Sequence, residues 1–116
     1  MREFVFYIDA RGREPVQEFL LEDLTNREAA FLIRWLEEAA TWPVLQYPHF
    51  KRLPDYEPWL GELRINRFRI FVHRLPDNRL LLVHAFKKKS EDTPQAEIKK
   101  ALNRITDYLT HHPDEY

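Results

Sequence analysis

The 116-residue sequence contains no cysteine, which excludes disulfide bonds and thiolate-bound metal ions. Since nothing in it calls for an oxidising compartment, we expect a reducing, cytoplasmic location. The only glycines are Gly12 and Gly61, so the chain has no glycine-rich loop of the kind that cradles nucleotide phosphates. No uncharged apolar run approaches about 18 residues, so we expect neither a membrane-spanning helix nor a signal peptide.

The net charge is only −1, but the charges are divided unevenly along the chain. Residues 1–48 hold five basic and nine acidic side chains, and residues 90–116 hold three and six. Residues 49–89 hold ten basic and four acidic side chains, a net charge of +6. We therefore expect a polyanion such as RNA to bind this middle segment. The near-zero total favours a short, specific contact over strong binding along a long nucleic acid.

Residues 59–89 alternate between apolar and polar side chains, the pattern of half-buried β-strands. The pattern predicts two antiparallel hairpins, turning at Asn66-Arg67 and around Asp77-Asn78, and the second would pair Val72 with Val83. One face of this sheet is apolar and collects the following residues: Leu63, Ile65, Phe68, Ile70, Val72, Leu81, Val83 and Ala85. The other, which we call the cationic face, collects mostly polar and aromatic side chains: Glu62, Arg64, Arg69, Phe71, His73, Leu82, His84, Phe86 and Lys88.

The first hairpin is predicted to place Arg64 directly opposite Arg69, with both side chains facing solvent. Like charges opposite each other destabilise a strand pair by up to about 1 kcal/mol. This pair therefore suggests a site where an anion binds between two guanidinium groups, which suit the geometry of phosphate. The alternative is an ordinary surface ion cluster in which Glu62 neutralises the two arginines. The sequence leaves both interpretations open.

Further elements are predicted around this sheet. A strand is expected over residues 2–8, a helix from Pro15, and a second helix from a Thr25 cap to about residue 41. The prolines between residues 43 and 58 allow at most a short strand at 49–53. A closing helix after Pro94 carries an apolar stripe that we expect to pack on the sheet's apolar face. The predicted order is β-α-α-β-β-β-α, a single α+β domain over residues 1–116 with an antiparallel sheet of an N-terminal strand plus a three-stranded meander and the helices on one side.

The ordered motifs of the sequence resemble the RelE/HigB superfamily of toxins, most closely its branch of phage-derived Gp49-like (HigB-type) proteins. The resemblance covers nearly the whole chain and implies a RelE-like fold. It is carried by these motifs: Glu62-Leu63-Arg64, Phe68-Arg69, the strand end His84-Ala85-Phe86-Lys87-Lys88-Lys89, then Thr93-Pro94 and Glu97-Ile98.

The resemblance implies the toxin of a type II toxin–antitoxin system, an mRNA interferase that cuts mRNA on the ribosome and inhibits translation. Such endoribonucleases need no metal or other cofactor and are neutralised by a cognate antitoxin, commonly a helix-turn-helix protein. In this family the mRNA 2′-hydroxyl attacks the adjacent phosphate, and cationic side chains stabilise the developing charge. Carried onto this chain, the catalytic positions are Arg64, Arg69 and Lys88. The expected RNA contacts are Lys51, His84, Phe86, Lys87 and Lys89.

The sequence departs from the family pattern where acid–base catalysis is concerned. Lysines that some RelE-type members carry on this strand are replaced by Leu60 and Glu62, and a tyrosine after the basic strand end has no counterpart. His49, and Asp107 with Tyr108, are loose candidates for HigB-type catalytic positions. The general base is therefore unassigned. A non-catalytic protein of the same fold that binds RNA, the ribosome or a partner stays an alternative, as does a phage-related protein whose basic face only docks an acidic partner.

Several of these residues also have plain structural interpretations. His84 titrates near neutrality and suits acid–base chemistry, but a lone strand histidine is more often structural. Phe86 can stack on an unpaired base, worth about 1–3 kcal/mol, or simply contact a loop. The lysine run can protect a strand end from unwanted pairing. Adjacent histidines, His111 and His112, on a tail make a poor chelate, so no metal site is predicted.

Overall fold

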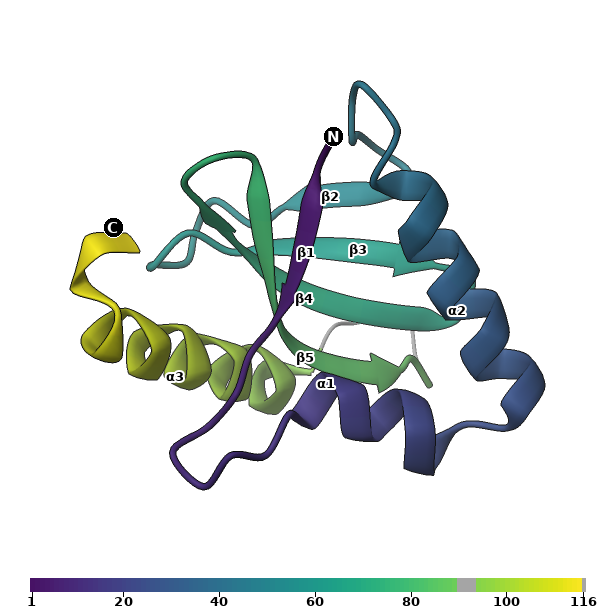
Figure 1. Ribbon diagram of the computed structural model, residues 1–116, viewed down its shortest axis with the longest axis horizontal. Helices are drawn as coiled ribbons and strands as arrows, with labels where there is room; N and C mark the ends of the chain where they lie inside the picture. The colour runs from purple at the N-terminus through teal and green to yellow at the C-terminus, as the bar shows by residue number, and fades with distance from the viewer. Residues whose placement is uncertain (90–93, 116) are drawn as a thin grey trace.

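The computed structural model describes residues 1–89 and 94–115, which form a mixed α+β structure around one open five-stranded sheet (Figure 1). Thr93, part of one family-like motif, lies outside the described residues. The elements are β1 (Glu3–Phe6), α1 (Pro15–Glu18), a π-helical turn η1 (Phe19–Asp23), α2 (Asn26–Ala39), β2 (Phe50–Arg52), β3 (Gly61–Ile65), β4 (Phe68–Leu75), β5 (Arg79–Lys87), α3 (Gln95–His111) and a 3₁₀ turn η2 (Pro113–Glu115). The short strand β2 lies within residues 49–53, where the sequence predicted at most a short strand.

The strands lie in the order β1-β5-β4-β3-β2, and all neighbours are antiparallel except β1 and β5. The prediction of a wholly antiparallel sheet is therefore wrong for the N-terminal strand. No tight hairpin joins β1 to its neighbour β5, because α1, α2 and three strands intervene. The direction of β1 is consequently free of the constraint that a short turn imposes on consecutive strands.

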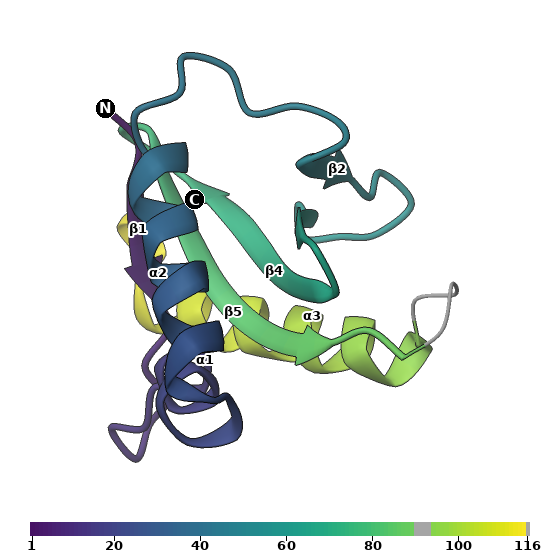
Figure 2. The same cartoon turned by 90° about the vertical axis from the view of Figure 1, so that its right-hand side faces the viewer.

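Helices cover both faces of the sheet, with α1 and α2 on one side and α3 on the other (Figures 1 and 2). The prediction that the helices lie on one side, and that the closing helix packs on Leu63 and its neighbours, is therefore wrong. The α3 stripe instead packs on Leu60, Phe71, Leu81 and Val83. Phe71 is fully buried there, so the cationic face has an apolar centre of its own to cover.

A β-bulge between β4 and β5 redistributes the leucine-rich part of β5 between the two faces. The pair Phe71–His84 forms as predicted, but Val72 then pairs with Leu82 instead of Val83. As a result Leu80 and Leu82 belong to the α1–α2 core, whereas Leu81 and Val83 belong to the α3 core. The bulge thus supplies the apolar surface on which α3 packs.

The start of α2 follows from its local sequence. The Thr25 hydroxyl accepts a hydrogen bond from the Glu28 amide at 3.1 Å, and the Glu28 carboxylate accepts one from the Thr25 amide at 3.0 Å. This capping box starts α2 where the sequence predicted it. None of the helices within residues 1–89 and 94–115 combines the length and apolar character needed to cross a bilayer.

Candidate nucleic-acid interface

Arg64 and Arg69 lie directly opposite each other on β3 and β4, as the alternation predicted. The two strands are joined by the two-residue turn Asn66-Arg67, in which Asn66 takes the left-handed conformation at φ 57°. Asparagine tolerates this conformation better than most residues, so the turn fixes the register. Glu62 lies two residues before Arg64 and therefore on the same face.

Arg69 is buried, with only 8% of its surface exposed, so the expectation that it faces solvent is wrong. Its Nη1 donates hydrogen bonds to the carbonyl oxygens of Asn66 at 2.8 Å and Phe68 at 2.9 Å. The guanidinium therefore folds back onto the β3–β4 turn. Burial lowers the pKa of Arg69, an effect that the nearby Glu62 carboxylate opposes and the Arg64 charge reinforces. The last two effects indicate that the three charged groups form one cluster.

Glu62 is the carboxylate of this cluster and is 3% exposed. Its Oε1 lies 3.8 Å from Arg64 Nε, a loose ion pair. The Glu62 Oε2 and Arg69 Nε atoms are both buried without a hydrogen-bond partner among the described residues. Because a buried polar atom without a partner is costly, a water would be stabilised at either atom, and a bound anion at Arg69 Nε, which is a donor.

Arg64 is the accessible guanidinium, with 27% of its side chain exposed. Its Cζ lies 5.6 Å from the ring centroid of Tyr47 in the proline-rich segment. Sequence reasoning missed Tyr47, because nothing periodic in that segment indicates which side chain returns to the sheet. Lys51 pairs with Glu62 across β2 and β3 and is exposed, so it shares the face of Arg64. These contacts bring Lys51, Arg64 and Arg69 together on one face.

His84 uses both ring nitrogens to connect β5 with α3. Its Nε2 lies 3.0 Å from Glu97 Oε2, and its Nδ1 lies 3.1 Å from Arg104 Nη1. Since arginine only donates, Nδ1 is the acceptor and Nε2 carries the proton that is donated to Glu97. Burial lowers the pKa of His84, while the Glu97 carboxylate opposes this effect. In this arrangement neither nitrogen is open to RNA.

Arg104 was also missed from the sequence, although a signal for it exists. Glu97 and Arg104 are seven residues apart on α3 and therefore lie on one side of the helix. Arg104 Nη1 donates to the Val83 carbonyl at 2.9 Å as well as to His84. The sequence alone does not show that His84, Glu97 and Arg104 meet, because their proximity depends on which face of the sheet α3 covers.

The remaining predicted positions lie at the end of β5. The Phe86 ring packs on Phe71 at 5.5 Å and on His84 at 5.6 Å between centroids, and it is only partly buried. Lys87 Nζ forms an ion pair with Glu28 Oε2 at 3.3 Å. The Lys88 amide donates to the Arg67 carbonyl at 2.7 Å, which brings Lys88 beside the β3–β4 turn. Lys89 lines a hollow of about 470 Å³ together with Phe86 and Lys87.

Residues 20–106 match the family described as phage-derived Gp49-like proteins (DUF891). The chain belongs to this family. It is a family of RelE/HigB-like toxins in general, which links this Gp49-like protein to toxin–antitoxin systems and suggests an antitoxin as its partner. The matched segment contains all of the predicted catalytic and RNA-contacting positions. A search of curated proteins found no match to the chain.

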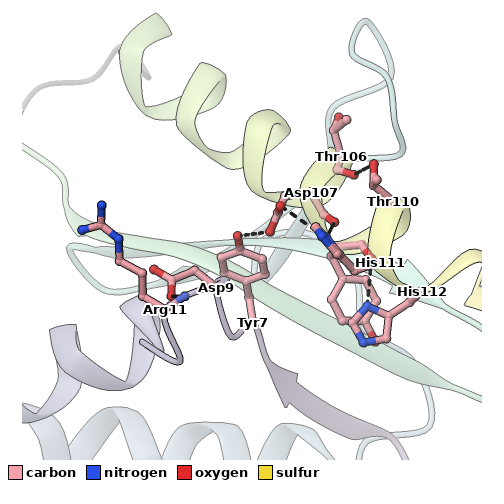
Figure 3. A network of polar contacts seen from close by, with 9 residues as sticks. Tyr7, Asp9, Arg11, Thr106, Asp107, Thr110, His111 and His112 are labelled. Atoms are coloured by element: carbon pink, nitrogen blue, oxygen red, sulfur yellow. Dashed lines mark hydrogen bonds and ion pairs between the residues drawn. The ribbon is translucent and has the colours of Figure 1, made fainter.

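Two of the loose candidates for acid–base groups of this Gp49-like protein, Asp107 and Tyr108, lie on α3, whereas the His49 carbonyl accepts a hydrogen bond from the Arg64 amide at 2.8 Å. Asp107 Oδ2 accepts a hydrogen bond from the Tyr7 hydroxyl at 2.6 Å, and His111 Nδ1 lies 3.5 Å from Asp107 Oδ1 (Figure 3). Burial, assisted by Asp107, raises the pKa of Tyr7. Asp107 follows Glu97 by ten residues, about 15 Å along α3. These contacts connect β1 and α3.

His49 and Tyr108 likewise make aromatic contacts. His49 lies against the rings of Trp35 and Trp42, with centroid distances of 6.1 and 5.2 Å. Tyr108 stacks on His112 at 4.0 Å.

Within residues 1–89 and 94–115, no group of three or more histidine, aspartate or glutamate side chains is arranged to hold a metal ion.

Proposed function

We propose that this chain is the toxin of a type II toxin–antitoxin system and cuts mRNA on the ribosome without a metal ion, in a RelE-like fold. Membership of the Gp49-like family supports the toxin assignment. The observation that supports RNA cleavage is the cluster of two guanidinium groups around one loosely paired carboxylate. With one carboxylate for two arginines, the cluster keeps a net charge of +1 and attracts a phosphate.

The proposed reaction uses the RNA's own hydroxyl as nucleophile. The 2′-oxygen bonds to the adjacent phosphorus while the bond from phosphorus to the 5′-oxygen breaks, giving a 2′,3′-cyclic phosphate and a 5′-hydroxyl end. The 2′-hydroxyl loses a proton to a base, and the leaving 5′-oxygen gains one. Arg64 and Arg69 stabilise the charge that develops on the phosphate oxygens, and Lys88 is the proposed acid or phosphate contact.

The other predicted positions serve as RNA contacts in this proposal. Lys51 extends the cationic face at its β2 edge, and Phe86 extends it at the end of β5. Lys87 lies opposite Phe68 on the other face and pairs with Glu28, so Lys87 and Lys89 are proposed to contact RNA that passes around this strand end. His84 is better supported as a positioning residue than as an RNA contact, because Glu97 and Arg104 occupy both of its nitrogens. Its proposed role is to hold the β5 end, and with it Phe86, against α3.

The test is cleavage of mRNA on purified ribosomes, with the cut ends mapped by primer extension. We expect cuts at the A-site codon with the parent chain and with the control Arg11→Ala, which removes an exposed arginine from a turn outside the cluster. Arg64→Ala should cut at least about 100-fold more slowly, because it removes one of the groups that stabilise the transition state. Cleavage by Arg64→Ala at the parental rate would contradict the proposed site.

A second candidate function is non-catalytic binding of RNA, the ribosome or a partner protein by the same face. Two observations favour it: Arg69 is buried, and both His84 nitrogens are occupied. In that case ribosomes would retain the chain in sedimentation while their mRNA stays intact. Arg64→Ala would then weaken the binding without changing any cleavage pattern.

We further propose a cognate helix-turn-helix antitoxin as partner and the cytoplasm, where ribosomes are, as location. An acidic segment of such a partner would cover the cationic face. Expression of the chain alone should arrest growth. Coexpression of the antitoxin should restore growth, and the antitoxin should copurify with the chain. Arrest that persists in the Arg64→Ala variant at equal expression would separate toxicity from the proposed RNA site.

A further inference from the structure

A second group of cationic and aromatic side chains lies on the opposite face of the sheet from Arg64 and Arg69. Arg52 pairs with Gly61, which in turn pairs with Val72, so Arg52 lies on the face of the α1–α2 core. Arg74 follows Val72 by two residues on β4 and shares that face. Arg74 is also five residues from Arg69, about 17 Å along the strand. The two arginine groups are therefore separate.

Trp59 joins Arg52 and Arg74 into one surface. The Arg52 Cζ lies 4.7 Å and the Arg74 Cζ 5.3 Å from the centroid of the Trp59 ring. These two distances limit the separation of the guanidinium carbons to 10.0 Å. A single strand of RNA can therefore contact both. We call these three residues the Trp59 surface.

The indole of Trp59 is held in place from several directions. The Phe50 ring stacks on it at 6.0 Å with an interplanar angle of 16°. The Trp59 carbonyl lies 2.7 Å from His73 Nδ1, which fixes the backbone. Gly61 leaves the space that the two rings fill, since a Cβ there would lie 2.6 Å from a Phe50 ring atom and 3.1 Å from Trp59. The ring is thus a preorganised platform.

The arginines of the Trp59 surface carry charges that no carboxylate of the described residues neutralises. Arg52 and Arg74 are both exposed and form no ion pair within residues 1–89 and 94–115. By contrast, Arg79 nearby is paired with Glu115 at 2.6 Å. Two guanidinium groups without an ion pair, both next to one indole ring, favour an anionic ligand that also carries an aromatic group able to stack.

A hollow beside the Trp59 surface fits the rest of such a ligand. It has a volume of about 570 Å³ and reaches from the Trp59 surface to the α3 side of the sheet. Its lining consists of Glu57, Pro58, Trp59, His73, Arg74, Leu75, Pro76 and Leu109. Indole, imidazole and proline walls suit a flat nucleobase, while the Glu57 carboxylate can accept a hydrogen bond from an exocyclic amino group. Aromatic platforms next to arginines are how proteins bind unpaired nucleotides, whose bases are free to stack.

We propose that the Trp59 surface is a second RNA-binding site, which holds an unpaired nucleotide of single-stranded RNA. Arg52 and Arg74 contact the phosphates, and the base lies in the hollow beside Trp59. The site is independent of the cleavage proposed for Arg64 and Arg69. Its function is to hold a single-stranded segment about 17 Å along β4 from Arg69.

The test is binding of a short fluorescein-labelled single-stranded oligoribonucleotide, followed by anisotropy at several salt concentrations. The Arg64→Ala chain is used, so that the first site is weakened and the probe stays intact. The double variant Arg52→Ala/Arg74→Ala should bind about tenfold more weakly, and the slope of log affinity against log salt should fall by about 1.4 because two phosphate contacts are lost. The matched control Arg11→Ala/Arg34→Ala removes two exposed arginines elsewhere and should change neither quantity to that extent.

Two further arms separate stacking from charge. Arg52→Lys/Arg74→Lys keeps the charges without the planar groups and should bind with intermediate affinity. A blunt RNA duplex should bind the parent surface more weakly than the single strand, because its bases are not free. Trp59→Phe tests the platform directly: the quenching of tryptophan emission by RNA should shrink, with Trp35 and Trp42 still reporting that the chain is folded.

The proposal is wrong if the double arginine variant binds RNA as tightly as the matched control, or if the duplex binds as tightly as the single strand. Intact mRNA on ribosomes combined with the expected loss of binding would reject only the cleavage proposal. Cleavage combined with unchanged binding would reject only the Trp59 surface. The two proposals therefore fail through different measurements.

Discussion

At the scale of single residues, the central feature is the buried carboxylate of Glu62 between two arginines. A buried charge is tolerated when opposite charges and hydrogen bonds surround it, and costly when a partner is removed. Glu62 is held loosely, at 3.8 Å from Arg64 Nε and with Oε2 unpartnered among the described residues. The cluster is therefore stable enough to persist and loose enough for an incoming phosphate to compete for the guanidinium groups.

Glu62→Gln is expected to lower the free energy of unfolding by about 1–3 kcal/mol, because the two arginines then repel each other without a compensating charge. Urea denaturation measures this loss, and Glu57→Gln in the exposed loop is the control. The same change should tighten phosphate binding, since the cluster charge rises from +1 to +2. A Glu62→Gln chain as stable as Glu57→Gln would show that the carboxylate does not hold the arginines together.

His84 and His73 predict how stability depends on pH. Burial lowers the pKa of both imidazoles below the ordinary value of 6.5. The unfolded chain therefore binds these protons more readily than the folded chain, and stability decreases as the pH falls below 6.5 towards the lowered values.

The urea concentration at the midpoint of unfolding should be lower at about pH 5.5 than at about pH 7.5. Both values lie above the range where carboxylates titrate. His84→Gln should make the loss smaller, and adding His73→Gln should make it smaller again. A parental pH dependence retained in the double variant would assign the loss to other groups.

At the scale of elements, the alternation of apolar and polar residues predicted β3 and β4 correctly, including the opposition of Arg64 and Arg69. It succeeded because a two-residue turn and a strict period of two leave a single register. It failed at β5, where residues 80–83 read Leu-Leu-Leu-Val. These side chains are apolar whichever face they occupy, so the pattern cannot reveal the extra residue of a bulge. The loop Pro76-Asp77-Asn78, with left-handed Asp77 and Asn78, connects the strands in this shifted register.

The side of the sheet that α3 covers was unpredictable for a related reason. An apolar stripe shows that a helix packs on something, but both faces of this sheet offer apolar residues. Once Leu81 and Val83 turn to the α3 side, that side has a core, and His84, Glu97 and Arg104 meet within it. The candidate site was thus predicted in its register but not in its burial, since burial depends on which helix lies where.

Gly61 at the start of β3 tests the packing of the aromatic rings. Gly61→Ala should destabilise the fold by about 1–3 kcal/mol, because the new methyl group meets the Phe50 ring and the stacked Trp59 cannot yield. Gly12→Ala is the informative comparison, since φ is +81° there and nothing lies within 4 Å of an added Cβ. Its cost of about 1 kcal/mol comes from backbone strain alone. Thermal unfolding should also show that only Gly61→Ala alters tryptophan emission in the folded state.

At the scale of the whole molecule, the strands that carry the two proposed RNA sites differ in how firmly the rest of the structure holds them. β4 has a strand on each side and helices over both faces, and seven of its eight residues are buried. β2 is an edge strand of three residues, two of them exposed, between proline-rich segments. Arg69 and Arg74 therefore stand on the firmest strand, whereas Lys51 and Arg52 stand on the weakest.

Hydrogen exchange should reveal this gradient. Amides of β4 and of the paired part of β5 should exchange only through global unfolding, while those of β2 should exchange through local opening at a much lower free energy. Single-stranded RNA bridging Arg52 and Arg74 should slow exchange in both β2 and β4, because the local opening of β2 and global unfolding both release the bound RNA. Protection of β2 equal to that of β4 in the free chain would contradict the gradient, and β2 exchange unaffected by bound RNA would remove Arg52 from the RNA contact.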